Sequence, residues 1–96
     1  MNDIRELKSL TPLFDAGGVS YAGVFGSFAR GEAHESSDID LLVRLDRRLS
    51  LLQLIRLERE LSEKAGRQID LVTEDALSPF IYDEVMHDLK TIYEKR

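Results

Sequence analysis

The stretch Val24–Val43, "VFGSFARGEAHESSDIDLLV", begins inside one apolar segment and ends inside another, with a polar connection between the two. Residues 19–25 are rich in β-favouring side chains and bounded by glycines, and residues 38–45 form a second apolar run, so both segments predict strands. Because residues i and i+2 of a strand point to the same side, Asp38 and Asp40 share one face. The stretch therefore presents two carboxylates on one side of the predicted sheet.

The rest of the chain predicts helices that alternate with strands, which is an α/β (α+β) pattern. The expected helices are residues 4–14, 51–65 and 79–89, and the further expected strands are residues 67–73 and 91–94. Pro12 either kinks the first helix or opens a second one. We expect a small mixed sheet of three or four strands with helices packed on it.

Apolar residues at helical spacing predict which faces the two later helices bury. In residues 51–65 that face contains Leu51, Leu54, Ile55, Leu57, Leu61 and Ala65. In residues 79–89 it contains Ile81, Tyr82, Val85 and Leu89. Both faces are expected to pack against the sheet.

Length and composition limit the classes of function. A chain of 96 residues fits a single domain, 1–96, and the absence of cysteine excludes thiolate chemistry. No run approaches the roughly 20 apolar residues that span a bilayer, so we expect no membrane partner and a cytoplasmic location. A net charge of −5 argues against direct nucleic-acid binding.

A third aspartate joins the first two if the strands flanking residues 51–65 are parallel, as a helical crossover favours. The tripeptide Ile39-Asp40-Leu41 then aligns with Ile69-Asp70-Leu71, which places Asp70 beside Asp40. Carboxylates ~5 Å apart repel by roughly 3 kcal/mol per pair at an effective dielectric near 20. They therefore take up protons or bind a cation, and oxygen ligands suit Mg²⁺ or Mn²⁺.

A glycine-serine turn ends the first strand, at Gly26 and Ser27. Glycine permits a tight turn whose N–H groups, with the serine hydroxyl, can donate to phosphate oxygens. No lysine follows at the spacing of a Walker A motif, and Phe25 excludes a nucleophile elbow. Gly26 and Ser27 alone would also fit a turn that binds no ligand.

Together these residues resemble a known family. Gly26-Ser27, ten residues, and then Asp38-Ile39-Asp40 match the GS-x10-D-x-D signature of the DNA-polymerase-β-like nucleotidyltransferases, and "GSFARG…SDIDLLV" is similar to the minimal nucleotidyltransferase (MNT) branch. The resemblance implies that Asp38, Asp40 and Asp70 are the catalytic and metal-binding residues, with two Mg²⁺ or Mn²⁺ ions as cofactors. It also implies that ATP is the substrate and that the Gly26-Ser27 turn grips its phosphates.

Three residues in the connection between the first two strands each have two possible roles. Arg30 could bind a phosphate or form a structural ion pair, and Ser37 could hydrogen-bond nucleotide or cap the strand. His34 could act as a base, although a solvated loop histidine is the simpler reading. We list Gly26, Ser27, Arg30 and Ser37 as the expected nucleotide-binding set.

The resemblance also implies a partner. Short MNT proteins pair with a HEPN-domain protein, often a toxin, and some transfer AMP to one of its tyrosines, which is an antitoxin role. Since 96 residues leave little room for a domain that holds the acceptor, we expect the acceptor to be such a folded protein. The alternative is a docking module that neutralises a HEPN partner by binding alone.

Overall fold

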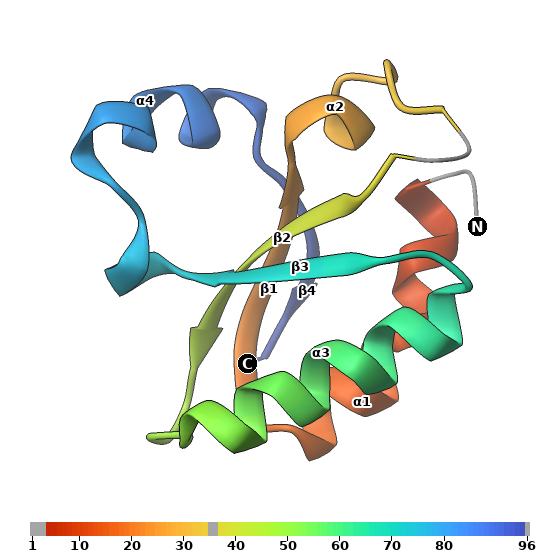
Figure 1. The fold of residues 1–96 in the computed structure, drawn as a ribbon, viewed down its shortest axis with the longest axis vertical. Coiled ribbons are helices and arrows are strands. Elements are labelled where there is room, and N and C mark those ends of the chain that lie inside the picture. The colour runs from red at the N-terminus through yellow and green to blue at the C-terminus, as the bar shows by residue number, and fades with distance from the viewer. Residues whose placement is uncertain (1–3, 35–36, 96) are drawn as a thin grey trace.

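The computed structural model describes residues 4–34 and 37–95, which form one four-stranded sheet with helices around it (Figure 1). The strands are β1 (Val19–Phe25), β2 (Ile39–Leu45), β3 (Ile69–Thr73) and β4 (Lys90–Glu94). The α-helices are α1 (Thr11–Ala16), α2 (Gly26–Ala29), α3 (Leu51–Ala65) and α4 (Pro79–Asp88), and two 3₁₀ helices are η1 (Ile4–Leu10) and η2 (Glu74–Ala76).

The strand order is β3-β2-β1-β4. β1 pairs antiparallel with both β2 and β4, whereas β2 and β3 are parallel and are connected by α3. The sheet is therefore mixed, and the predicted fold class and parallel crossover are confirmed. The predicted strand at the C-terminus is also present, as the edge strand β4.

Local sequence signals set the ends of the helices. Ser50 and Gln53 form a reciprocal capping box at the start of α3, and Gly66 ends that helix in the left-handed conformation, with φ of 68°. At the N-terminus, the question raised by Pro12 is resolved as two helices, η1 followed by α1. Pro12 lies in the first turn of α1, where a missing N–H removes no helical hydrogen bond.

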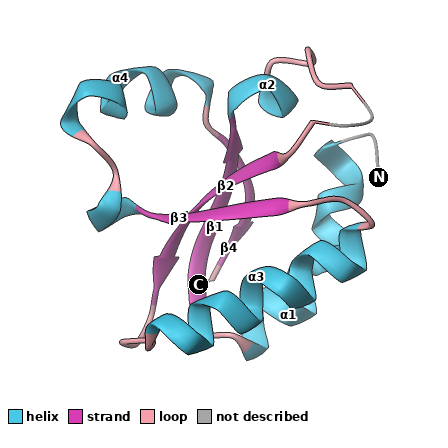
Figure 2. Cartoon of the chain, in the orientation of Figure 1, coloured by secondary structure: helices cyan, strands magenta, loops and turns pink. Residues whose placement is uncertain are grey.

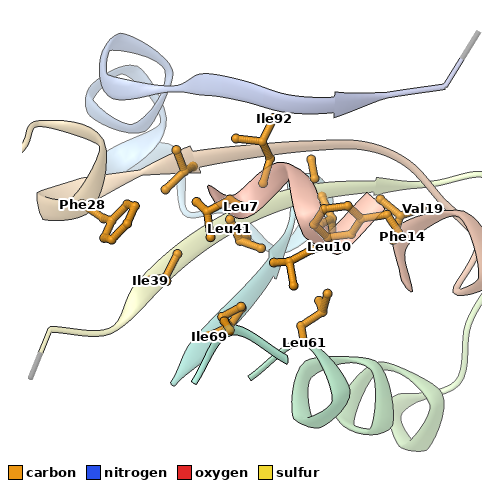
Figure 3. Packing of buried hydrophobic residues seen from close by; sticks show 14 of the residues in the cluster. Leu7, Leu10, Phe14, Val19, Phe28, Ile39, Leu41, Leu61, Ile69 and Ile92 are labelled. Carbon is orange, nitrogen blue, oxygen red and sulfur yellow. The ribbon is translucent and has the colours of Figure 1, made fainter. Parts of the chain in front are cut away.

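The hydrophobic core lies between the sheet and the layer formed by η1, α1 and α3. Figure 3 shows Phe14, Leu41, Leu61 and Ile69 converging from these elements, and all four side chains are fully buried. β2 supplies alternate residues to this core, as the period of a strand requires. This packing holds β2 and β3 in place on one face of the sheet. The opposite face of the same two strands carries Asp40 and Asp70.

The expected burial of the two later helices is only partly correct. In α3 the side chains of Leu57, Leu61 and Ala65 are buried, but Leu51 and Ile55 are exposed. In α4 only Val85 is buried, whereas Ile81 and Tyr82 are 43% and 41% exposed. Figure 2 shows α4 standing apart from α1 and α3, so no layer of the described chain covers these positions.

None of the helices in the described part of the chain combines the length and the apolar character needed to cross a membrane.

Candidate active site

Two aspartates lie side by side on adjacent strands. Asp40 of β2 is the direct neighbour of Asp70 in the parallel register with β3, and both side chains are half-buried. Asp38 directly precedes β2 and is exposed. The charge of Asp38 acts on the carboxyl groups of both Asp40 and Asp70. The structure thus brings together the three carboxylates that the sequence predicted to converge.

The proximity of these carboxylates raises their affinity for protons. Burial, then the charges of Asp70 and Asp38, raise the pKa of Asp40 above its ordinary value. Burial, then the charges of Asp38 and Glu58, raise the pKa of Asp70. In both cases desolvation and like charge disfavour the ionised form, so the site favours positive charge among these oxygens.

Gly26 brings the turn that follows β1 against these carboxylates. Phe25, the last residue of β1, pairs with Asp40 in the antiparallel register, and Gly26 follows with φ of 75°. A Cβ atom at Gly26 would lie 2.6 Å from Asp40 Oδ2, closer than van der Waals contact permits. Only glycine therefore combines this backbone conformation with this approach to Asp40.

Ser27 lies in the first turn of α2, directly after the turn at Gly26, and is half-buried. The N–H groups of a first helical turn have no partner within the helix, so they remain available to an acceptor. Phosphate oxygens are such acceptors, and the hydroxyl of Ser27 adds a further donor. The arrangement is compatible with the predicted phosphate contact, which stays a prediction.

Arg30, at the end of α2, forms two ion pairs. Its Nε lies 3.1 Å from Glu32 Oε2, and its Nη1 lies 2.6 Å from Asp88 Oδ2 at the end of α4. The second pair joins the helix that follows the glycine-serine turn to α4. A phosphate group would have to compete with these carboxylates for Arg30, and the nucleotide-binding role of this residue stays a prediction.

Ser37 and His34 belong to a small hydrogen-bonded turn of the connection. Ser37 N–H donates to the His34 carbonyl oxygen over 2.9 Å, and the Ser37 hydroxyl accepts from His34 N–H over 3.0 Å. Arg67 Nη1 also donates to the His34 carbonyl over 3.0 Å. The Ser37 hydroxyl keeps a proton to donate, and its contact with nucleotide stays a prediction.

The three carboxylates also have to be compared with what a divalent cation requires. Among residues 4–34 and 37–95, no three acidic, histidine or cysteine side chains stand as a preformed metal-ligand cluster. The donor chemistry nevertheless fits, since carboxylate oxygens are the ligands that Mg²⁺ and Mn²⁺ prefer. Burial and mutual repulsion raise the pKa of both Asp40 and Asp70, and a cation bound among these oxygens would offset the repulsion.

Two residues of α3 support the site and were not predicted from the sequence. Glu58 Oε2 accepts from Leu71 N–H over 2.8 Å, and the Ser62 hydroxyl accepts from Ile69 N–H over 2.9 Å. These bonds hold β3 on both sides of Asp70. Because Glu58 and Ser62 are four residues apart, they share one face of α3, and this spacing was the available signal.

Comparisons with known proteins agree with this geometry. Residues 8–96 match the family model "Polymerase beta, Nucleotidyltransferase". "Putative protein adenylyltransferase MJ0435" of Methanocaldococcus jannaschii is 39% identical over 87 residues, which cover 90% of this chain and 94% of the relative. Protein adenylyltransferase MntA of Thermococcus cleftensis is 43% identical over 72 residues, which cover 75% of this chain and 73% of the relative.

The fold is also similar to a solved structure of a tri-AMPylated Shewanella oneidensis HEPN toxin in complex with MNT antitoxin. The match has a TM-score of 0.73 and 18% identity, and it covers 96% of this chain and 73% of the matched chain. At that identity the likeness concerns the fold. The family match over residues 8–96 and the two relatives show that the chain belongs to the polymerase beta nucleotidyltransferase family.

Proposed function

We propose that this protein transfers AMP from ATP to a hydroxyl group of a partner protein and releases pyrophosphate. The observation that carries the proposal is the contact of Gly26, in the phosphate-binding turn, with Asp40, beside Asp70 on the next strand. Relatives named protein adenylyltransferase support the same reaction.

The reaction assigns a task to each element of the site. The turn at Gly26 and Ser27 binds the β- and γ-phosphates of ATP through N–H groups and the serine hydroxyl. The acceptor oxygen attacks the α-phosphorus, a new P–O bond forms, and the bond to the bridging oxygen of the β-phosphate breaks. Asp70, on the edge strand β3, accepts the proton of the acceptor hydroxyl through one of its carboxylate oxygens.

Asp38, Asp40 and Asp70 would also hold the divalent cations. Two Mg²⁺ or Mn²⁺ ions supply charge stabilisation for the attacking and leaving oxygens of an in-line displacement. The raised pKa values of Asp40 and Asp70 support this assignment, because both groups gain stability from nearby positive charge.

A tyrosine of a HEPN-domain protein is the acceptor that we favour. A tyrosine hydroxyl has a pKa of about 10, so it needs a base or a cation to become a good nucleophile at neutral pH. The Shewanella oneidensis complex of a tri-AMPylated HEPN toxin with MNT antitoxin supports a HEPN-domain protein as the acceptor. AMP transfer to the toxin would constitute an antitoxin role.

Intact-mass spectrometry of a co-expressed pair tests the proposal. We expect a HEPN-domain protein to be encoded beside this chain, and it should gain mass in steps of one AMP when excess Mg-ATP is present. Asp40→Asn should abolish the gain, while Asp83→Asn, on the exposed face of α4, should leave it unchanged. A formed complex whose partner stays unmodified would contradict transfer and leave a docking role.

A further inference from the structure

The first half of α3 exposes three large apolar side chains. Leu51 is 73% exposed, Leu52 is 78% exposed and Ile55 is 49% exposed. Isolated exposed leucines are common, but three within five residues of one helix form a patch, and such patches mark interaction surfaces. Part of this patch belongs to the apolar face that the sequence predicted to be buried, and no other described element covers it.

The patch borders an open groove along the edge of the sheet. Leu51, Leu54 and Ile55 of α3 form one wall, and Leu71 and Val72 of β3 form the other. The groove has a volume of about 370 Å³. Its walls are thus largely apolar, so a ligand seated in it gains mainly by burying apolar surface.

The hydrogen bonds of the strand edge limit what the groove can accept. The outward N–H groups of Ile69 and Leu71 are already bonded to Ser62 and Glu58 of α3. An added strand would have to break both bonds, which protects the edge against β-augmentation. The groove therefore suits the side chains of a helix, whose backbone bonds are satisfied internally.

The charges around the patch specify the partner further. Between Arg44 and Arg59 the chain has five arginines and two acidic residues, although its net charge is −5. Arg48 and Arg56 are exposed, and in the described part of the chain neither forms an ion pair. A second copy docked patch to patch would bring like charges together, whereas an acidic partner would be attracted.

The groove also lies beside the candidate active site. Leu71 and Val72 directly follow Asp70 in β3, and Glu58, which also lines the groove, accepts a hydrogen bond from Leu71 N–H. In Figure 1, α3 runs alongside β3 toward that end of the sheet. A protein that docks at the first half of α3 therefore lies along the same edge strand that carries Asp70.

We propose that the start of α3 and the segment before it form a docking surface for an amphipathic acidic helix of the acceptor protein. This surface, the leucine–arginine patch, consists of Leu51, Leu52, Ile55, Arg48 and Arg56. This inference rests on the proposed function, since it names the surface that brings the acceptor to the site. The apolar face of the partner helix packs against the exposed side chains and into the groove. Its acidic residues pair with Arg48 and Arg56, which line one hollow on the side of α3 away from the groove, where Arg56 follows Leu52 by four residues.

Binding measurements separate the patch from the chemistry. The full chain is titrated by calorimetry with the HEPN-domain protein encoded beside it. Leu51→Gln with Ile55→Gln keeps good helix formers in α3 and should weaken binding about tenfold or more. Arg48→Glu with Arg56→Glu should weaken it similarly, and raising the salt concentration should weaken binding of the parent but not of this variant.

Two matched variants serve as controls. Phe80→Ser changes a 97% exposed aromatic residue of α4, and Lys64→Glu reverses a charge at the far end of α3. Both should bind like the parent. The docking surface is wrong if the patch variants bind like the parent, if no complex forms, or if sedimentation shows self-association that the patch variants abolish. AMP transfer, read separately by mass, tests the proposed function even where this surface fails.

Discussion

The two faces of the sheet use the same strand for different purposes. On one face Ile39, Leu41 and Val43 of β2 are fully buried against the helical layer. On the other face Asp40 is only half-buried, next to Asp70, and burial and like charge raise its pKa. Apolar packing on the first face therefore stabilises a strand pair whose carboxylates on the second face repel each other.

The largest expected effect is on the packed face. Leu61→Ala removes a fully buried side chain of α3 and should lower the free energy of unfolding by about 2–5 kcal/mol. Urea denaturation measures the change. Leu52→Ala, at a 78% exposed position of the same helix, is the matched control and should change stability by about 0.5 kcal/mol or less. Equal losses in the two variants would contradict the account of the core.

The second prediction concerns the carboxylate face with ligand present. A ligand at one hundred times its Kd stabilises a protein by about 2.7 kcal/mol, so Mg-ATP should raise the melting temperature of the parent. Asp40→Asn should lose this gain, whereas Asp83→Asn should keep it. If Asp40→Asn responds to Mg-ATP as the parent does, the assignment of Asp40 is wrong.

The same variant behaves differently in chelator. Since folding raises the pKa of Asp40, protonation of this group stabilises the fold at low pH, and that stability is lost as the pH rises through the folded pKa. At neutral pH the ionised group is therefore unfavourable. Asp40→Asn without metal should be neutral or slightly stabilising, and a clear loss of stability would favour a structural role.

The third prediction concerns the link between α3 and the carboxylate face. Glu58→Ala leaves the N–H of Leu71 without its acceptor, at a cost of about 1–3 kcal/mol. Glu58→Gln keeps a carbonyl acceptor and should retain most of the stability. Thermal unfolding of both variants checks this. Equal behaviour of the two would mean that the hydrogen bond does not hold β3.

The last prediction concerns the glycine turn. Gly26 and Gly31 both have φ of 75°, so alanine at either position should cost about 1 kcal/mol in backbone strain. They differ in surroundings, because nothing lies within 4 Å of a Cβ at Gly31, whereas one at Gly26 displaces the Asp40 carboxylate. Only Gly26→Ala should lose the stabilisation by Mg-ATP, and equal responses would disconnect the turn from the carboxylates.

Much of this arrangement was predictable because neighbouring residues specify it. The repeated Ile-Asp-Leu tripeptides fixed the register of β2 and β3, since a parallel pair buries matching apolar residues on one side. Likewise, Ser50 and Gln53 marked the start of α3. The contact between Gly26 and Asp40 was not predictable from spacing alone, because it depends on the antiparallel register of β1 and β2.

The predictions that were wrong or missing share a physical cause. Helical periodicity tells which residues lie on one face, but not whether a second layer covers that face, so Ile55, Ile81 and Tyr82 were wrongly expected to be buried. Glu58 was missed because its partner is a backbone N–H group, which any residue of β3 would provide. Such contacts depend on tertiary packing rather than on side-chain pattern.

Label transfer from ATP tests the central claim most directly. The parent chain and a HEPN-domain protein, the proposed acceptor, are incubated with Mg²⁺ and ATP labelled at either the α- or the γ-phosphate. The account predicts that the partner gains label from the α-phosphate alone, and that Asp40→Asn abolishes the gain. Transfer of the γ-label, or no transfer in a formed complex, would contradict the proposal that the turn and the three carboxylates form one adenylyl-transfer site.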